Sequence, residues 1–149
     1  MKKLCRYFIV PALFLLLIFC FSACGDNDTI TLNVYNWGEY ISDGGEGSLD
    51  VNKAFEEYYE KWYYEKYGKE IKVNVNYTTY ASNEDLYAKM KSGAADYDII
   101  VPSDYMIERL KSEGLLQTID LEKIPNYSNI LDKFKNPYYD NGEEKYSVM

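Results

Sequence analysis

The nine residues VYNWGEYIS, from Val34 to Ser42, bring a tryptophan, a glutamate and a tyrosine together around one glycine. The face of an aromatic ring attracts cations, and a carboxylate supplies the counter-charge that a cation needs when it leaves water. Trp37, Glu39 and Tyr40 therefore have the chemistry of a binding corner for a positively charged group. A less specific interpretation stays open, in which these aromatic residues only anchor a loop.

The composition favours some classes of partner over others. The chain has 149 residues, with 17 tyrosines, 2 tryptophans and a formal net charge of -8. So many aromatic residues exceed what one small core buries, and many are expected at partly wet surfaces. The acidic balance argues against nucleic acid as a partner, because binding it relies on a basic surface.

The residue types that most enzymes and metal sites use are scarce. The sequence has no histidine, no Gly-rich phosphate motif and no serine and lysine pair at catalytic spacing. Its acidic residues are not spaced as in a calcium-binding loop. We therefore predict no enzymatic activity, no cofactor and no metal ion.

The first 23 residues have the layout of a secretory signal peptide. A basic start, MKKLCRY, precedes the uncharged apolar run FIVPALFLLLIFCF, which is shorter than the roughly 20 residues of a membrane-spanning helix. Removing residues 1–23 would take 3 of the 16 basic residues and none of the 24 acidic ones, leaving a net charge of about −11. Cys24 would then be the only cysteine, so no internal disulfide is expected.

Ser22 and Ala23, directly before Cys24, resemble the lipobox of bacterial lipoproteins. In such a motif the signal peptidase cuts before the cysteine, whose sulfur carries a lipid. The resemblance implies a lipid anchor at Cys24, a tether over residues 24–29 and a location on the outer face of the cytoplasmic membrane. The alternative is a plain N-terminal anchor helix with an incidental cysteine, and Phe21 stands where a lipobox usually has leucine.

Strand and helix patterns alternate after the tether. Period-2 alternation or continuous apolar runs predict three strands, over 30–35, 71–77 and 97–101, the last buried on both faces. Helical spacing predicts three helices, over 49–68, 82–93 and 103–114. Ser82 or Asn83 is expected to cap the second and Ser103 or Asp104 the third, and each helix is expected to end at a glycine: Gly68, Gly93 and Gly114. This alternation is typical of an α/β fold in which helices flank a parallel sheet.

The pattern weakens after Gly114. We expect a short extended piece, irregular turns around Pro125 and a final turn that leads into another strand. The sequence stops at Met149 inside an apolar run, as a fragment would.

In an open parallel sheet, ligands bind beyond the carboxyl ends of the strands, where the strand order reverses. If the spatial order is 2-1-3, the loops after the first and third strands are neighbours. Trp37, Glu39 and Tyr40 follow the first strand, and Ser103 and Tyr105 follow the third. These five residues would then converge on one cleft.

Four segments occur in the order and spacing that spermidine/putrescine-binding proteins of bacterial ABC importers have: VYNWGEYI, YASNEDLYAKMKSG, YDIIVPSDYMIERLKSEGLLQTID and NYSNI. The resemblance runs from about Ile30 to Met149. It implies a two-lobed periplasmic-binding-protein type II fold, whose lobes close over a linear polyamine. Members of this family are longer, so residues 30–149 would form an incomplete N-terminal lobe that stops before the second lobe.

The resemblance also implies roles for individual residues. Trp37 would be the cleft tryptophan, Glu39 the acid that contacts an amine end, and Tyr40 the adjacent aromatic residue. Ser103 and Tyr105 would be the ligand-facing pair in the loop after the third strand. The implied partners are a polyamine and an ABC transporter permease, and the protein is expected to be a monomer.

Two alternatives remain. A receptor of the same fold could bind an anion or a metal chelate, since Ser103 opens a helix whose N–H groups suit an oxyanion, although Glu39 would repel it. The chain could instead be a surface carbohydrate-binding or adhesion lipoprotein, but the cleft loops offer few amides besides Asn36. Gly38 stands where some polyamine receptors have threonine, so any side-chain contact at that place is absent.

Overall fold

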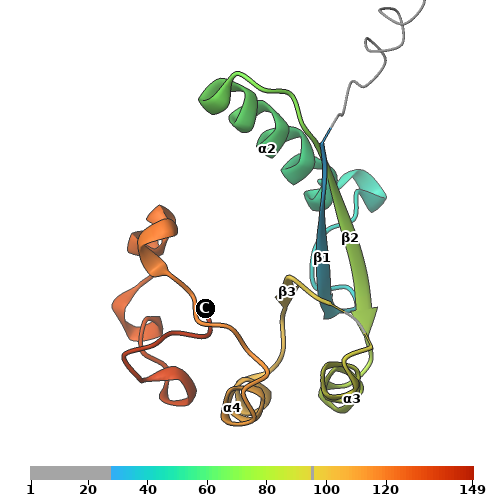
Figure 1. Ribbon diagram of the computed structural model, residues 1–149. Coiled ribbons are helices and arrows are strands. Elements are labelled where there is room, and N and C mark those ends of the chain that lie inside the picture. Colours follow the sequence, from blue (N-terminus) through green and yellow to red (C-terminus); the bar gives the residue numbers. More distant parts are fainter. Residues whose placement is uncertain (1–27, 95) are drawn as a thin grey trace, which may run out of the picture.

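A computed structural model describes residues 28–94 and 96–149 (Figure 1). The expected signal peptide and Cys24 lie outside these residues. The strands are β1 (Thr29–Trp37), β2 (Lys72–Tyr80) and β3 (Ile99–Ile100). The α-helices are α2 (Val51–Tyr67), α3 (Asn83–Ser92) and α4 (Asp104–Ser112). Short 3-10 turns are η1 (Gly45–Gly47), η2 (Leu121–Lys123), η3 (Pro125–Asn129), η4 (Asp132–Phe134) and η5 (Tyr138–Asp140).

The three strands form a parallel sheet in the order β2-β1-β3, which confirms the α/β prediction and the 2-1-3 order. β1 pairs with β2 in register from Thr29 opposite Lys72 to Trp37 opposite Tyr80. The carboxyl ends of these two strands therefore finish level with each other. Both strands point toward α3, so the loops that follow them meet at that end of the molecule (Figure 1).

The prediction that the third strand is buried on both faces is wrong. β3 has only two residues, pairs with β1 alone among the described strands, and leaves Ile99 45% exposed. A continuous apolar run is buried on both faces only where other elements cover them. No other described strand lies beyond β3 to complete such a layer.

The helix ends confirm the capping predictions for α2 and α3. The Ser82 hydroxyl, rather than Asn83, caps α3 by accepting the Asp85 N–H at 3.1 Å, and Gly93 ends that helix in the left-handed conformation. Gly68 ends α2 in the same way, with φ 66°. Ser103 stands at the N-cap position of α4 but makes no side-chain cap to it, and Glu113 rather than Gly114 is the C-cap residue. The prediction of a Ser103 or Asp104 side-chain cap is therefore wrong, and the Ser103 hydroxyl is left for other contacts.

The core lies between the carboxyl end of the sheet and the two helices below it. Its buried members come from β1, β2, α3 and α4: Tyr35, Tyr80, Leu86, Met106 and Leu110. α2, in contrast, has no buried residue and packs mainly along β2. The best-packed part of the chain is therefore the part that carries the strand-end loops.

Two carboxylates of α2 take the place of a neighbouring strand along the outer edge of β2. Glu60 accepts the Val73 N–H at 3.0 Å, and Glu56 accepts the Val75 N–H at 2.7 Å. Glu56 and Glu60 lie four residues apart on a helix, which is about 6 Å, and Val73 and Val75 lie two residues apart on a strand, which is about 6.6 Å. The spacing of the two carboxylates therefore matches the spacing of the two N–H groups. These side chains satisfy N–H groups that an edge strand otherwise presents to other strands.

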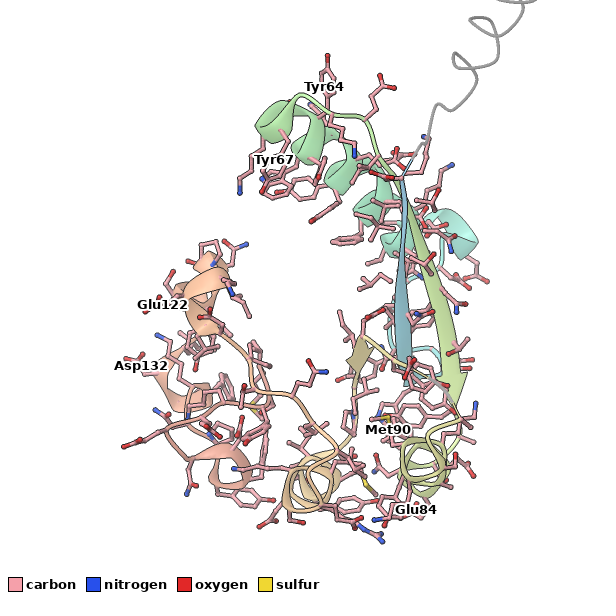
Figure 2. The ribbon with its side chains drawn as sticks, viewed as in Figure 1. Tyr64, Tyr67, Glu84, Met90, Glu122 and Asp132 are labelled. Carbon is pink, nitrogen blue, oxygen red and sulfur yellow. The ribbon has the colours of Figure 1, made fainter. Side chains whose placement is uncertain are left out.

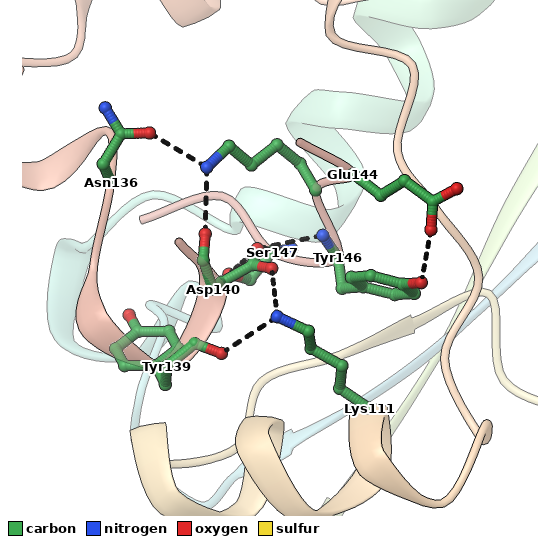
Figure 3. Close-up of polar contacts among 8 residues, drawn as sticks. Lys111, Asn136, Tyr139, Asp140, Glu144, Tyr146 and Ser147 are labelled. Atoms are coloured by element: carbon green, nitrogen blue, oxygen red, sulfur yellow. Dashed lines mark hydrogen bonds and ion pairs between the residues drawn. The ribbon is translucent and has the colours of Figure 1, made fainter. Parts of the chain in front are cut away.

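The last residues fold back onto α4 through the buried carboxylate of Asp140 (Figure 3). It accepts the Tyr146 and Ser147 N–H groups at 2.9 and 2.8 Å, and Lys111 lies 3.4 Å away. Burial raises the pKa of Asp140, but these hydrogen bonds outweigh it and hold the pKa below its usual value. We call Asp140 with these three partners the Asp140 latch.

The final strand expected near the end of the sequence does not form. Residues 141–149 contain no strand, and one backbone hydrogen bond, from the Ile119 N–H to the Lys145 carbonyl at 2.7 Å, pairs this segment with the chain after α4. No described strand pairs with residues 141–149, and the Asp140 latch uses the Tyr146 and Ser147 N–H groups instead. Within residues 28–94 and 96–149, no helix has the length and apolar character needed to cross a membrane.

Candidate ligand-binding site

The loop after β1 exposes the three residues of the predicted binding corner to different degrees. Trp37 ends the strand and is half-buried, whereas Glu39 is exposed and Tyr40 is 65% exposed. Glu39 adopts φ 57°, a left-handed conformation that costs a non-glycine residue roughly 1–2 kcal/mol. No hydrogen bond or ion pair within the described part of the chain engages its carboxylate. Such strain is found at ligand-binding positions more often than elsewhere.

Tyr80 joins the ends of all three strands. Its ring lies 4.6 Å from the Trp37 ring, and its hydroxyl donates to the Val101 carbonyl at 2.5 Å, just after β3. Burial, together with the neighbouring phenols of Tyr35, Tyr40, Tyr105 and Tyr77, raises the pKa of Tyr80 to about 12. The phenol therefore stays neutral at physiological pH, and the pair of rings formed by Trp37 and Tyr80 carries no charge of its own.

Asn83, the first residue of α3, links that helix to the loop before α4. Its side chain is only 4% exposed. The amide oxygen accepts the Ser103 N–H at 3.2 Å, and the amide nitrogen donates to the hydroxyls of Ser103 and Tyr105 at 3.0 and 2.9 Å. The Tyr105 hydroxyl in turn donates a hydrogen bond to the Glu84 carboxylate at 3.3 Å. Ser103 and Tyr105 are thus held by one buried amide.

The start of α4 already holds a carboxylate of its own. Asp104 accepts the Tyr105 N–H at 2.8 Å and the Tyr138 hydroxyl at 2.6 Å. The Tyr138 hydrogen bond, followed by the Tyr105 N–H, lowers the pKa of Asp104, so the side chain is ionised at neutral pH. With the Ser103 N–H given to Asn83, the N-terminus of α4 has two of its N–H donors engaged by side chains.

The structure brings most of the predicted site residues to one end of the sheet. Trp37 contacts Tyr80, and Tyr40 and Tyr105 both lie near enough to Tyr80 to influence its pKa. Ser103 and Tyr105 meet at Asn83. Glu39 sits in the same loop as Trp37 and Tyr40.

The sequence prediction missed the residues of the second strand-end loop. Tyr80 and Asn83 connect the loops that follow β1 and β3, and Glu84 accepts a hydrogen bond from the Tyr105 hydroxyl. Their signal was present, because the segment TTYASN directly follows the predicted second strand. Capping preference predicted Asn83 only as an alternative cap to Ser82, and the sequence cannot show that its amide turns toward another loop.

A shallow surface depression of about 370 Å³ lies elsewhere, between α2 and the start of β2. Glu60, Tyr64 and Ile71 are among its lining residues. Figure 2 shows Tyr64 at one end of the molecule and Glu84 at the other, so this depression is remote from the strand-end loops. No group of metal-ligating side chains occurs among the residues that the structure describes.

The chain is similar to known solute-binding proteins. A family model described as bacterial extracellular solute-binding protein matches residues 45–146. The spermidine/putrescine-binding periplasmic protein of Escherichia coli (strain K12) is 34% identical over 151 residues, covering 99% of this chain and 36% of that protein. The putrescine-binding periplasmic protein SpuD of Pseudomonas aeruginosa is 33% identical, covering 69% of this chain and 23% of that protein.

The chain is also similar to solved structures of substrate-binding proteins. The spermidine/putrescine ABC transporter substrate-binding protein PotD of Streptococcus pneumoniae matches with a TM-score of 0.54 at 35% identity, over 76% of this chain and 30% of that one. The TpPotD lipoprotein of Treponema pallidum matches with a TM-score of 0.53 at 34% identity, over 77% of this chain and 31% of that one. The chain therefore spans about a third of the length of these relatives.

Proposed function

The chain belongs to the bacterial extracellular solute-binding proteins, and we propose that it forms the first lobe of a receptor that captures polyamines such as spermidine and putrescine. The observation that carries this proposal is that Trp37 packs on Tyr80 at the carboxyl end of the sheet, in the segment that also carries the exposed Glu39. We call the five predicted residues at this end the binding wall: Trp37, Glu39, Tyr40, Ser103 and Tyr105. The relatives that share this part of the chain are named for binding spermidine or putrescine.

The chemistry of a polyamine fits such a wall. The ligand is a flexible chain of methylene groups between ammonium charges. Aromatic faces pack against the methylenes and attract the charges, at about 0.5–2 kcal/mol for each cation-π contact. A carboxylate is also needed, because an ammonium group is costly to remove from water unless it is paired. Trp37 and Tyr40 would supply the faces, and Glu39 the charge.

Ser103 and Tyr105 would supply hydrogen-bond acceptors on the other side of the same wall. Their hydroxyl oxygens are fixed by Asn83 at 3.0 and 2.9 Å. An ammonium group is purely a donor, so oxygen atoms held in place suit it. In this proposal the five predicted residues form one face of a cleft, and a second lobe provides the opposite face.

Anion binding is less well supported by the same geometry. The Ser103 N–H donates to Asn83 and the Tyr105 N–H to Asp104, so these donors are occupied. The ionised Asp104 would also repel an anion at that helix end. A carbohydrate receptor would use amides at the cleft surface, and Asn36 is buried rather than exposed there.

Capture by such a receptor requires no covalent chemistry, and we propose that the protein is not an enzyme. Closure of two lobes would remove the ligand from water, and the closed form would deliver it to an ABC transporter permease. Binding of one ligand by one receptor fits a monomer. An extracytoplasmic location follows the periplasmic relatives.

We further propose that residues 1–23 are a cleaved signal peptide and that Cys24 carries the lipid anchor. Ser22 and Ala23 before the cysteine support this, as does the lipoprotein among the similar structures. One acyl chain binds a membrane only marginally, so the several chains of a bacterial lipoprotein would be needed. Mass spectrometry of the membrane fraction should find a lipid-modified Cys24 at the N-terminus, and an unmodified Cys24 would contradict the proposal.

Isothermal titration calorimetry of a polypeptide that carries both lobes tests the ligand class. Spermidine, putrescine, phosphate and an oligosaccharide should be titrated under the same conditions. We expect saturable binding of at least one polyamine and none of phosphate or sugar. Saturable phosphate or oligosaccharide binding without polyamine binding would replace this function with one of the alternatives.

A further inference from the structure

We propose that Asn83 is a positioning residue that holds the hydroxyl oxygens of Ser103 and Tyr105 in place, so that this part of the wall accepts hydrogen bonds from a ligand. The inference rests on the proposed function, because it concerns how that site distinguishes an ammonium ligand. It adds a residue that does not itself face the predicted ligand.

The orientation of the Asn83 amide follows from its partners. The backbone N–H of Ser103 can only donate, so the atom that faces it at 3.2 Å must be the amide oxygen. The amide nitrogen then faces the two hydroxyls, to which it donates at 3.0 and 2.9 Å. Both hydrogens of the nitrogen are used, and both hydroxyl oxygens act as acceptors toward Asn83.

The proton of Tyr105 is directed toward Glu84. The hydroxyl donates to Glu84 at 3.3 Å while it accepts from Asn83. A phenol has one proton, so its remaining capacity toward a ligand is a lone pair. An ammonium group can use that lone pair, whereas an anion meets no donor there.

Burial gives Asn83 the stiffness that this role requires. The side chain is 4% exposed and its amide makes three hydrogen bonds, so rotation would leave buried polar groups unsatisfied. Ser103 and Tyr105 lie in a loop and at a helix start, and they are partly exposed. The neighbouring helix, through Asn83, therefore holds two side chains that their own segment does not fix.

A double-mutant cycle on the two-lobed protein separates this role from a purely structural one. Asn83→Ala should weaken spermidine binding about tenfold in the parent, as expected for two neutral hydrogen bonds that hold acceptors in place. In the Ser103→Ala/Tyr105→Phe background, the same change should weaken binding less than about twofold. That background keeps the backbone N–H at position 103, so any loop support that Asn83 provides through it is retained.

Ser82→Ala is the matched control. Its hydroxyl caps α3 one residue earlier and donates to Asp85 at 2.8 Å, so the variant should lower the melting temperature without changing the dissociation constant. If Asn83→Ala weakens binding by the same factor in both backgrounds, Asn83 supports the loop only and the inference is overturned. If the parent protein itself binds no polyamine, the proposed function is contradicted, and the titration of the parent distinguishes this result from a failure of the inference on Asn83.

Discussion

Trp37 combines two contributions to ligand binding in one side chain. It offers a large apolar face for methylenes and the most favourable ring for a cation-π contact. Trp37→Ala in the two-lobed protein should therefore weaken spermidine binding by about 1–3 kcal/mol. Calorimetry measures the loss, and Trp62→Ala on α2 is the control. Trp62 packs on Tyr59 and Tyr67, so its removal can lower stability but should leave the affinity of the folded protein unchanged.

Glu39 contributes charge rather than surface. Glu39→Gln keeps the shape of the side chain but leaves an ammonium group without its counter-charge, and a hydrogen bond to a charged group is worth about 1.5–3 kcal/mol. We expect a loss at least as large as that of Trp37→Ala, and a larger one at low ionic strength because the side chain is exposed. Dissociation constants in 20 and 500 mM salt would measure it. An unchanged affinity for spermidine would remove Glu39 from the site.

Sequence reasoning predicted Trp37 and Glu39 as site residues because their chemistry is local. The aromatic and acidic types around Gly38 can be read from one short segment, and strand order places the loop at the sheet edge. Asn83 differs, since its proposed role depends on which way an amide faces across two loops. Its burial and its three hydrogen bonds come from packing between α3 and the start of α4, which no periodicity in the sequence encodes.

At the scale of elements, α2 protects the outer edge of β2 through Glu56 and Glu60. Glu56→Ala together with Glu60→Ala should expose the Val73 and Val75 N–H groups, which their carboxylates now accept. We expect faster amide exchange at Val73 and Val75, or concentration-dependent association through the open edge. Hydrogen exchange measured by NMR, with sedimentation at several concentrations, tests both results.

The matching glutamine variants sharpen that experiment. Glu56→Gln with Glu60→Gln keeps an acceptor oxygen at each place, so protection at Val73 and Val75 should largely persist. Glu57→Ala, on the exposed side of the same helix, should change neither measurement. Equal exchange rates in the alanine and parent proteins would show that α2 does not protect the edge.

The Asp140 latch is the second contact between elements whose removal should have a large effect on stability. Asp140→Ala would leave the partly buried Tyr146 and Ser147 N–H groups without their acceptor and Lys111 without its partner. We expect a loss of about 2–4 kcal/mol in the free energy of unfolding, measured by urea denaturation. Asp132→Ala removes an exposed ion pair with Lys135 and should cost less than about 1 kcal/mol.

The pH dependence provides an independent check on the same carboxylate. The folded state lowers the pKa of Asp140 below its usual value, so the unfolded chain binds its proton more readily. The stabilisation is therefore present above the unfolded pKa of about 3.9 and is lost as pH falls through the lower folded value. Between neutral pH and pH 3, stability should fall less steeply in Asp140→Asn than in the parent. Parallel curves would show that the latch does not titrate as proposed.

The elements themselves were largely predictable, and the exceptions share one cause. Periodicity located β1, β2 and the three helices, because alternation and capping act within a single segment. β3 and the final segment failed the prediction, since whether an apolar run becomes a buried strand depends on a neighbour. Ile99 stays 45% exposed because no described element covers it.

At the scale of the whole molecule, the described elements form an open arch rather than a closed layer (Figure 1). α2 and the C-terminal turns lie at its two ends, and the sheet with α3 and α4 connects them. The relatives are about three times as long, since the chain covers 36% of the Escherichia coli protein and 30% of the Streptococcus pneumoniae structure. The proposed function assigns the face opposite the binding wall to a second lobe.

This geometry predicts that residues 24–149 alone bind polyamine far more weakly than a two-lobed protein. One wall pairs an ammonium group with Glu39 on one side only and leaves its other side in water. Water screens that pair, so its attraction at about 4 Å falls toward the roughly 1 kcal/mol of bulk solvent. Without a second lobe, the carboxylates that would hold the other ammonium groups are missing as well. We expect at least about a 100-fold weaker dissociation constant for spermidine, measured by calorimetry on both proteins with circular dichroism to verify folding. Micromolar binding by the folded short chain would falsify the requirement for two lobes and would place the whole affinity in the wall formed by Trp37, Glu39, Tyr40, Ser103 and Tyr105.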